Sequence, residues 1–301
     1  MDGKMTNPLQ GNYRYDKVIN GVNHYVREFD NLDQLYNLVC DSDDCSNYSS
    51  HSKEYEGFYG TDTFDEAVKL ARYGWEEGLK GLDYYEDMAD KAYASKVNDN
   101  MWDVELSTTG SYVDVGTYLQ GIPECMCDFV SKRTNTFADI IVNPTISCKV
   151  SKKTIMNRGR EIMKLIDALE KRHIKTRVVV MSVVCSRLMN IGDRWVVKVV
   201  AKDYNEMLDQ NRLIFVLAHS SYPRRMMFVV QEKEKDIRGI FGCPSGGYGR
   251  PGNISKLPDE IWKPQFENTY TFLFDDVNHY DEEVKYVKKR VEEIVTGRTY
   301  A

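Results

Sequence analysis

The chain contains no long hydrophobic run. Its longest mostly apolar stretches are Val178–Val184, Leu213–Ala218 and Met226–Val230. These are far shorter than the roughly 20 residues that a membrane-spanning helix needs. The first 14 residues are polar and lack the apolar core of a signal peptide. We therefore expect no membrane association and a cytoplasmic protein.

An excess of basic residues is also missing. The 301-residue chain has a formal net charge of -6, whereas proteins that bind nucleic acid usually present a basic face to the phosphates. The composition thus argues against direct binding of nucleic acid. An acidic protein can instead present itself as a polyanion to a DNA-binding partner.

The seven cysteines follow no metal-binding pattern, and their odd number without a signal peptide indicates reduced thiols. Cys125 and Cys127 are separated by one residue, which is too tight for a zinc knuckle. Cys40 and Cys45 have no histidine pair at ligand spacing. The acidic residues 41–44 lack the glycine and terminal glutamate of a calcium loop. We predict no metal and no cofactor.

A catalytic motif is missing as well. His219, Ser220 and Ser221 suggest a nucleophile and a base, but adjacent residues rarely serve each other in this way, and no G-x-S-x-G elbow is present. We expect a helix end here, with Arg224 and Arg225 exposed beyond it. No catalytic residue is assigned, and the chain is predicted not to be an enzyme.

What the chain does contain is a repeated switch of its hydrophobic period. Apolar, β-branched stretches at 137–150, 176–185 and 195–201 are interrupted by a helical period at 151–172, and a further strand is predicted at 269–274. Such switching predicts an α/β fold, in which helices flank a mixed sheet. The core is expected to be von Willebrand factor A-like or Rossmann-like, without a metal motif.

The N-terminal part predicts a smaller α+β unit. Asn20-Gly21 is a strong turn between two predicted strands, 13–19 and 24–29. Asn31 is placed to cap a helix, and Thr63 to Glu66 form a capping box for another. Glycines and a proline punctuate residues 98–128, which indicates a junction. We therefore divide the chain into domains 1–128 and 129–301, with a final helix at 281–296.

Residues 242–250 hold the densest glycine cluster. One hypothesis is a phosphate cradle made by Gly246, Gly247 and Gly249 with Arg250, in which backbone N–H groups point at an anion. The Lys-Ser or Lys-Thr ending of a P-loop is absent. The alternative function is therefore an α/β nucleotide- or phosphate-binding enzyme, whose pocket would include Arg224, Arg225 or His219. The other interpretation is a surface loop that contacts a partner.

Tyrosine is frequent, with 20 residues. Tyrosines on polar segments favour protein interfaces, because they bury a large area at small entropic cost. The predicted partner-binding residues are Tyr48, Tyr55, Tyr59, Tyr112, Tyr118, Tyr248 and Arg250.

Several short segments together resemble an uncharacterised family of tailed-bacteriophage proteins. They spread over most of the chain, and they are Val26–Leu32, Thr63–Leu70, Tyr118–Met126, Leu208–Leu213 and Gly247–Pro251. The α/β part resembles a von Willebrand factor A-like sheet that has lost its metal motif, since residues 143–147 contain no aspartate.

The resemblance carries a functional expectation. Acidic phage proteins of this size are similar to anti-defence inhibitors, such as the Gabija anti-defence proteins. This implies a homo-oligomer in the cytoplasm of the infected bacterial host, which binds a defence complex of the nuclease type and blocks its access to DNA. A virion or packaging accessory protein is the third hypothesis.

Overall fold

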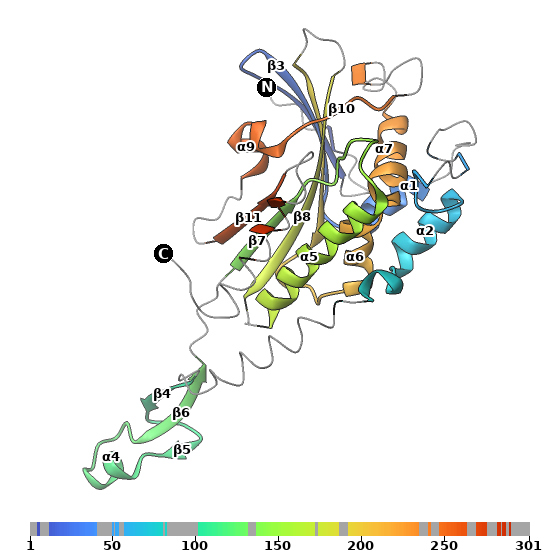
Figure 1. Cartoon of the computed structure of the whole chain (residues 1–301). Coiled ribbons are helices and arrows are strands. Elements are labelled where there is room, and N and C mark those ends of the chain that lie inside the picture. Colours follow the sequence, from blue (N-terminus) through green and yellow to red (C-terminus); the bar gives the residue numbers. More distant parts are fainter. Residues whose placement is uncertain are drawn as a thin grey trace.

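The structure is a computed structural model that describes residues 5–6, 12–40, 50, 52–53, 57–80, 82, 102–131, 137–171, 174–186, 192–234, 240–241, 247–263, 269–275, 282, 283, 285, 286 and 289. In this part of the chain, an eight-stranded mixed sheet is flanked by helices, and three further strands form a separate, smaller sheet (Figure 1). The predicted mixed α/β fold is confirmed. None of the described helices is both long and apolar enough to cross a bilayer.

The large sheet combines parallel and antiparallel pairs. Its spatial order is β1 (Met5–Thr6), β2 (Asn12–Ile19), β3 (Val22–Phe29), β9 (Arg194–Lys202), β8 (Lys175–Cys185), β7 (Phe137–Val142) and β11 (Thr269–Phe274). The pairs β3–β9, β7–β8 and β7–β11 are parallel, and the others are antiparallel. A short strand, β10 (Arg250–Pro251), pairs with the end of β8 beyond the residues that pair with β7.

The N-terminal hairpin belongs to this sheet. Asn20 and Gly21 both have positive φ angles, 53° and 76°, as the predicted two-residue turn requires. Strand β3 then pairs with β9 over six residue pairs, and Val26 and Phe29 are buried. The pairing covers what would otherwise be an open edge of β9. Strands from both sides of the predicted domain boundary at residue 128 therefore belong to one sheet.

One face of the sheet is covered by most of the helices, which are α1 (Leu32–Cys40), α2 (Phe64–Tyr73), η2 (Glu76–Leu79), α5 (Lys152–Glu170), α6 (Gln210–Ala218), the π-helix η3 (Tyr222–Met226) and α7 (Met227–Lys233). The predicted caps at Asn31 and Thr63 are confirmed, and Ser151 caps α5; each of the three side chains accepts a backbone N–H bond. Helix α6 starts at Gln210, directly after Asp209, whose side chain caps it. Helices α5 and α6 cross closely at Gly159, where a Cβ would lie 2.3 Å from the Leu217 carbonyl oxygen.

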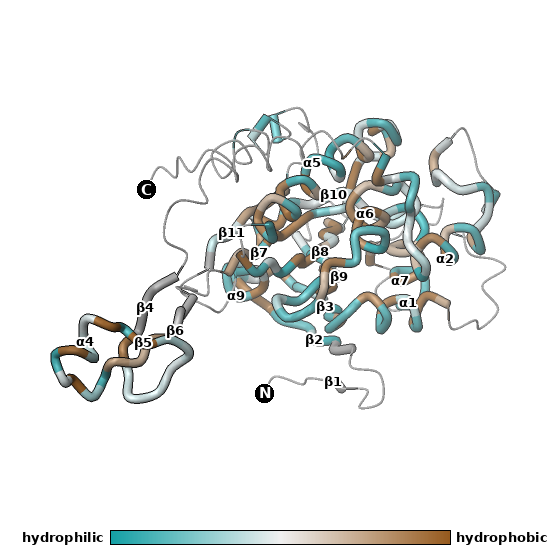
Figure 2. Tube along the Cα trace, turned by 90° about the horizontal axis from the view of Figure 1, so that it is seen from below, coloured by the Kyte–Doolittle hydropathy of each residue, from teal (hydrophilic) through white to brown (hydrophobic). Residues whose placement is uncertain are grey.

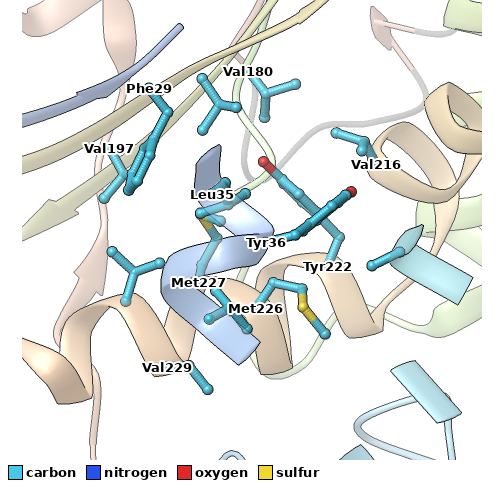
Figure 3. Packing of buried hydrophobic residues seen from close by; sticks show 14 of the residues in the cluster. Phe29, Leu35, Tyr36, Val180, Val197, Val216, Tyr222, Met226, Met227 and Val229 are labelled. Atoms are coloured by element: carbon cyan, nitrogen blue, oxygen red, sulfur yellow. The ribbon is translucent and has the colours of Figure 1, made fainter. Parts of the chain in front are cut away.

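Part of the core on this face is made by α1, η3 and α7 against the sheet, and α5 and α6 pack on it beside them. Figure 3 shows Leu35 and Tyr36 of α1 beside Tyr222 and Met226, with Val180 and Val197 of the sheet close by. All of these residues are buried. The π-helix thus lies at the centre of the packing between the helices and the sheet.

The opposite face carries a thinner cover. Within the described residues it consists of η4 (Ile254–Lys256) and α9 (Asp259–Trp262), whose Ile254 and Ile261 pack on Val183 and Val196 (Figure 1). Trp262 packs partly buried against this cluster.

The predicted junction contains the smaller sheet. It has the strand order β4 (Trp102–Ser107), β6 (Met126–Ser131) and β5 (Tyr112–Val113), all antiparallel, and the short helix α4 (Val115–Leu119) follows β5. The side chain of Asp114 caps α4 through the Thr117 amide. The described residues of the predicted final helix, 281–296, are helical, and the others lie outside the described part of the chain.

Candidate functional site

A cavity of about 390 Å³ opens on the helical face, where β7 and β8 end. It is bounded by the segment that follows β7, by the second half of β8, by η3 and α7, and by the segment 247–251. Ligands of open α/β sheets generally bind outside the carboxyl ends of the parallel strands. The volume also falls within the range of small-molecule pockets. The cavity is therefore the first candidate site.

Aromatic rings form one wall of the cavity. Phe228 of α7 and Tyr248 stack almost in parallel, with 3.6 Å between their centroids and 3° between their planes. Phe58 lies beyond Phe228 at 6.5 Å. The Tyr248 hydroxyl donates a hydrogen bond to Glu232, which is buried. Tyr248, predicted to contact a partner protein, thus lines this cavity.

Two polar side chains of the sheet also line the cavity. Ser182 of β8 and Trp195 of β9 are 2% and 1% exposed. Neither the Ser182 hydroxyl nor the Trp195 Nε1 has a hydrogen-bond partner among the described residues. The sequence reasoning missed both residues, although Ser182 interrupts the apolar run 178–184 and could have been noticed there.

The prediction that Arg224 and Arg225 are exposed is wrong. They are 4% and 0% exposed, because the π-helix that carries them turns both side chains inward. Arg224 borders the cavity, as the alternative hypothesis expected. Its guanidinium lies 4.4 Å from the centroid of the Phe58 ring and donates to the backbone carbonyls of Phe58 and Val150.

Arg225 points to a different segment. Its guanidinium donates to the carbonyl oxygens of Ser50, Ser52 and Thr61 at 2.7, 2.9 and 2.7 Å. It also lies over the Tyr59 ring at 4.2 Å. Tyr59, predicted to bind a partner, is itself 8% exposed and therefore belongs to the interior. Tyr48 and Tyr55 lie outside the described residues.

The glycine cluster is partly explained by packing. A Cβ at Gly249, whose φ is +86°, would lie 2.3 Å from Val184 Cγ1, so only glycine lets this segment approach β8. Arg250 then pairs with Cys185, so the end of the glycine-rich segment belongs to the sheet. Gly247, Gly249 and Arg250 line the cavity, and Gly246 lies outside the described residues.

His219, Ser220 and Ser221 do not form a nucleophile–base pair. Both serine hydroxyls donate to the Tyr59 carbonyl, and the Ser221 hydroxyl also contacts Thr61. His219 Nδ1 accepts the Ser221 backbone N–H. These bonds fasten the segment 59–61 to the end of α6.

The buried imidazole makes stability depend on pH. Burial, and then the charge of Lys152, lowers the pKa of His219 to about 4. Below pH 6.5 the unfolded chain binds a proton that the folded chain rejects, so stability falls as the pH drops from 6.5 towards 4. Between pH 7 and 4.5, wild type should lose roughly 2 kcal/mol more than His219→Asn, which cannot titrate. Urea unfolding at both pH values measures this, and equal losses would contradict it.

The small sheet forms a second candidate site. Among the described residues, seven of the twelve large hydrophobic side chains that are exposed lie between residues 106 and 122. Along β5 and α4, hydrophobic residues alternate with neutral and hydrophilic ones (Figure 2). The seven are Leu106, Tyr112, Val113, Val115, Tyr118, Leu119 and Ile122. Tyr112 and Tyr118, which were predicted to bind a partner, are 59% and 62% exposed.

The same segment is strongly acidic. Residues 102–131, hereafter the acidic sheet, contain five Asp or Glu residues and no Lys, Arg or His. Almost the whole net charge of the chain, -6, therefore lies on one tenth of its length. The sequence reasoning treated this segment as a junction and did not note the concentration of charge.

No group of three or more His, Cys, Asp or Glu residues that could hold a metal ion occurs in the described ranges. Cys40, Cys125, Cys127, Cys148 and Cys185 are free thiols.

A family model described as "Domain of unknown function (DUF7192)" matches residues 7–297. The chain belongs to this family. No curated protein and no solved structure matches it. For this DUF7192 member, the residues themselves are thus the basis for a functional proposal.

Proposed function

We propose that the chain is a protein-binding inhibitor that docks on its partner through the acidic sheet. The observation that carries the proposal is the group of seven exposed hydrophobic side chains between residues 106 and 122. Soluble proteins rarely expose such groups except where they bind another molecule. Small sheets also need a covered hydrophobic face for stability, which a partner would supply.

Charge indicates what kind of partner fits. The five carboxylates belong to the same segment as these apolar side chains, and no cation of that segment offsets them. Complementary potentials favour a partner with a basic face. Proteins that bind DNA carry such faces for the phosphates, so an acidic, apolar surface would compete with DNA for the same site.

This chemistry supports the expectation drawn from the phage resemblance. The target in this proposal is a bacterial defence complex of the nuclease type, as in Gabija defence, in the cytoplasm of the infected host. The inhibitor would act by occupying the DNA-binding face and needs no catalytic group. We also propose a homo-oligomer, whose contacts lie outside the acidic sheet because two copies of this surface repel each other.

Leu119→Asp tests the docking surface. Leu119 is 78% exposed on α4, so the change adds charge to the apolar contact without removing core packing. We expect binding to a purified Gabija nuclease complex to weaken about tenfold or more, because apolar anchors at the centre of an interface carry most of its affinity. Co-elution and inhibition of DNA cleavage are the two measurements.

Met207→Asp is the matched control. Met207 is 94% exposed outside the acidic sheet and receives the same new charge, so it should bind like wild type. Duplex DNA and added salt should both weaken the wild-type complex. Absence of co-elution, or equal binding by the two variants, would contradict the proposal.

A further inference from the structure

The cavity beside β8 is lined by two buried polar groups that a ligand atom could satisfy with hydrogen bonds. The register pairs Ser182 with Val197 and Val184 with Trp195, so Ser182 and Trp195 are diagonal neighbours on one face of the sheet. Both line the cavity, and both lack a hydrogen-bond partner among the described residues. The Trp195 indole N–H can only donate, so its partner must be an acceptor.

The walls of the cavity favour a flat ligand. Phe58, Phe228 and Tyr248 border it from the helical side, and Trp195 borders it from the sheet. Aromatic side chains stack on planar rings of any kind, because every such ring has a π-face. Proteins that bind single-stranded nucleic acid hold the bases in this way. A planar ring that carries acceptor atoms therefore matches both the walls and the buried donors.

The rim adds a positive charge. Arg250 is exposed, and it lines the cavity together with Gly247 and Gly249. The packing of Gly249 on Val184 holds this segment above the second half of β8. A guanidinium at the mouth of an apolar cavity suits an anionic group attached to the ring.

We propose that this cavity binds a nucleoside phosphate. The base enters among the aromatic rings, its acceptor atoms take hydrogen bonds from the Ser182 hydroxyl and the Trp195 N–H, and the phosphate lies at Arg250. The cavity residues lie outside the acidic sheet, so this site is independent of the proposed protein-binding surface, and either proposal can fail alone.

The test is a thermal-shift and calorimetry series on the full chain, with the four common ribonucleosides and their 5′-monophosphates as probes. At least one monophosphate should raise the melting temperature, because a ligand that binds the folded state stabilises it. Ser182→Ala should weaken that binding about fivefold, which corresponds to one neutral hydrogen bond. The variant should still fold, because it removes a hydroxyl that has no protein partner among the described residues.

Two further variants locate the parts of the ligand. Arg250→Ala should weaken the monophosphate and leave the matching nucleoside unchanged. Ser107→Ala, in the small sheet, should affect neither. Absence of stabilisation by all eight probes would overturn the proposal. The proposal would also be overturned if neither Ser182→Ala nor Arg250→Ala weakened binding of the monophosphate. If only Arg250→Ala weakened it, the proposed contact of the base with Ser182 would be overturned.

Discussion

Replacing Arg225 by Ala is expected to lower the free energy of unfolding by about 3–5 kcal/mol, which is large for a single substitution. The side chain is completely buried. Its loss would leave the carbonyls of Ser50, Ser52 and Thr61 without this donor and would remove the cation from the Tyr59 ring. Urea unfolding followed by circular dichroism measures the effect.

Two other arginine variants make the result specific. Arg250→Ala changes an exposed arginine, so its stability should stay within about 0.5 kcal/mol of wild type. Arg225→Lys keeps the charge but not the planar fork of donors, and it should lie between wild type and Arg225→Ala. If Arg225→Ala were as stable as Arg250→Ala, the hydrogen bonds of the buried guanidinium to Ser50, Ser52 and Thr61 would not contribute to stability.

The sequence could not reveal the burial of Arg225, and the reason is local. Arginine is among the residues most often exposed, and a helical period normally alternates buried and exposed positions. In Tyr222–Met226 every residue is buried. The wider π-helical turn is buried among α1, α2 and the sheet. Neither the usual exposure of arginine nor the alternation of buried and exposed positions therefore holds for its residues.

Features determined by neighbouring residues were predicted correctly. The turn at Asn20-Gly21 follows from the backbone angles that these two residues tolerate, and the cap at Thr63 from its side-chain oxygen. The valine-rich strands follow from β-branching and burial. The parallel pairing of β3 with β9 joins residues about 170 positions apart, and no local pattern specifies such a partner.

The candidate sites illustrate the same limit. The nucleotide hypothesis rested on the glycine cluster, which does border the cavity. Its deeper donors, Ser182 and Trp195, come from two other strands, and only the sheet register brings them together. The acidic sheet was visible in the sequence as a run without basic residues. Its exposed hydrophobic side chains became apparent only once the strands were placed.

Replacing Arg177 by Ala is also expected to cost about 3–5 kcal/mol of unfolding free energy, because it strands a buried charge. Asp139 of β7 is 0% exposed. Its two oxygens accept from Arg177 Nε and Nη2 at 2.7 and 3.0 Å, and the Tyr204 hydroxyl donates at 2.7 Å. After the substitution, the hydroxyl of Tyr204 alone would not balance the carboxylate.

The carboxylate itself can be tested by neutralising it. Asp139→Asn combined with Arg177→Ala should be more stable than Arg177→Ala alone, because the double variant buries no unbalanced charge. Lys17→Ala breaks the exposed pair with Glu260 and should cost less than about 1 kcal/mol. Additive effects at positions 139 and 177 would refute the coupling. The pair lies near the beginning of β7 and β8. A positive coupling would show that the charge pair, as well as the backbone hydrogen bonds, holds these two strands in register.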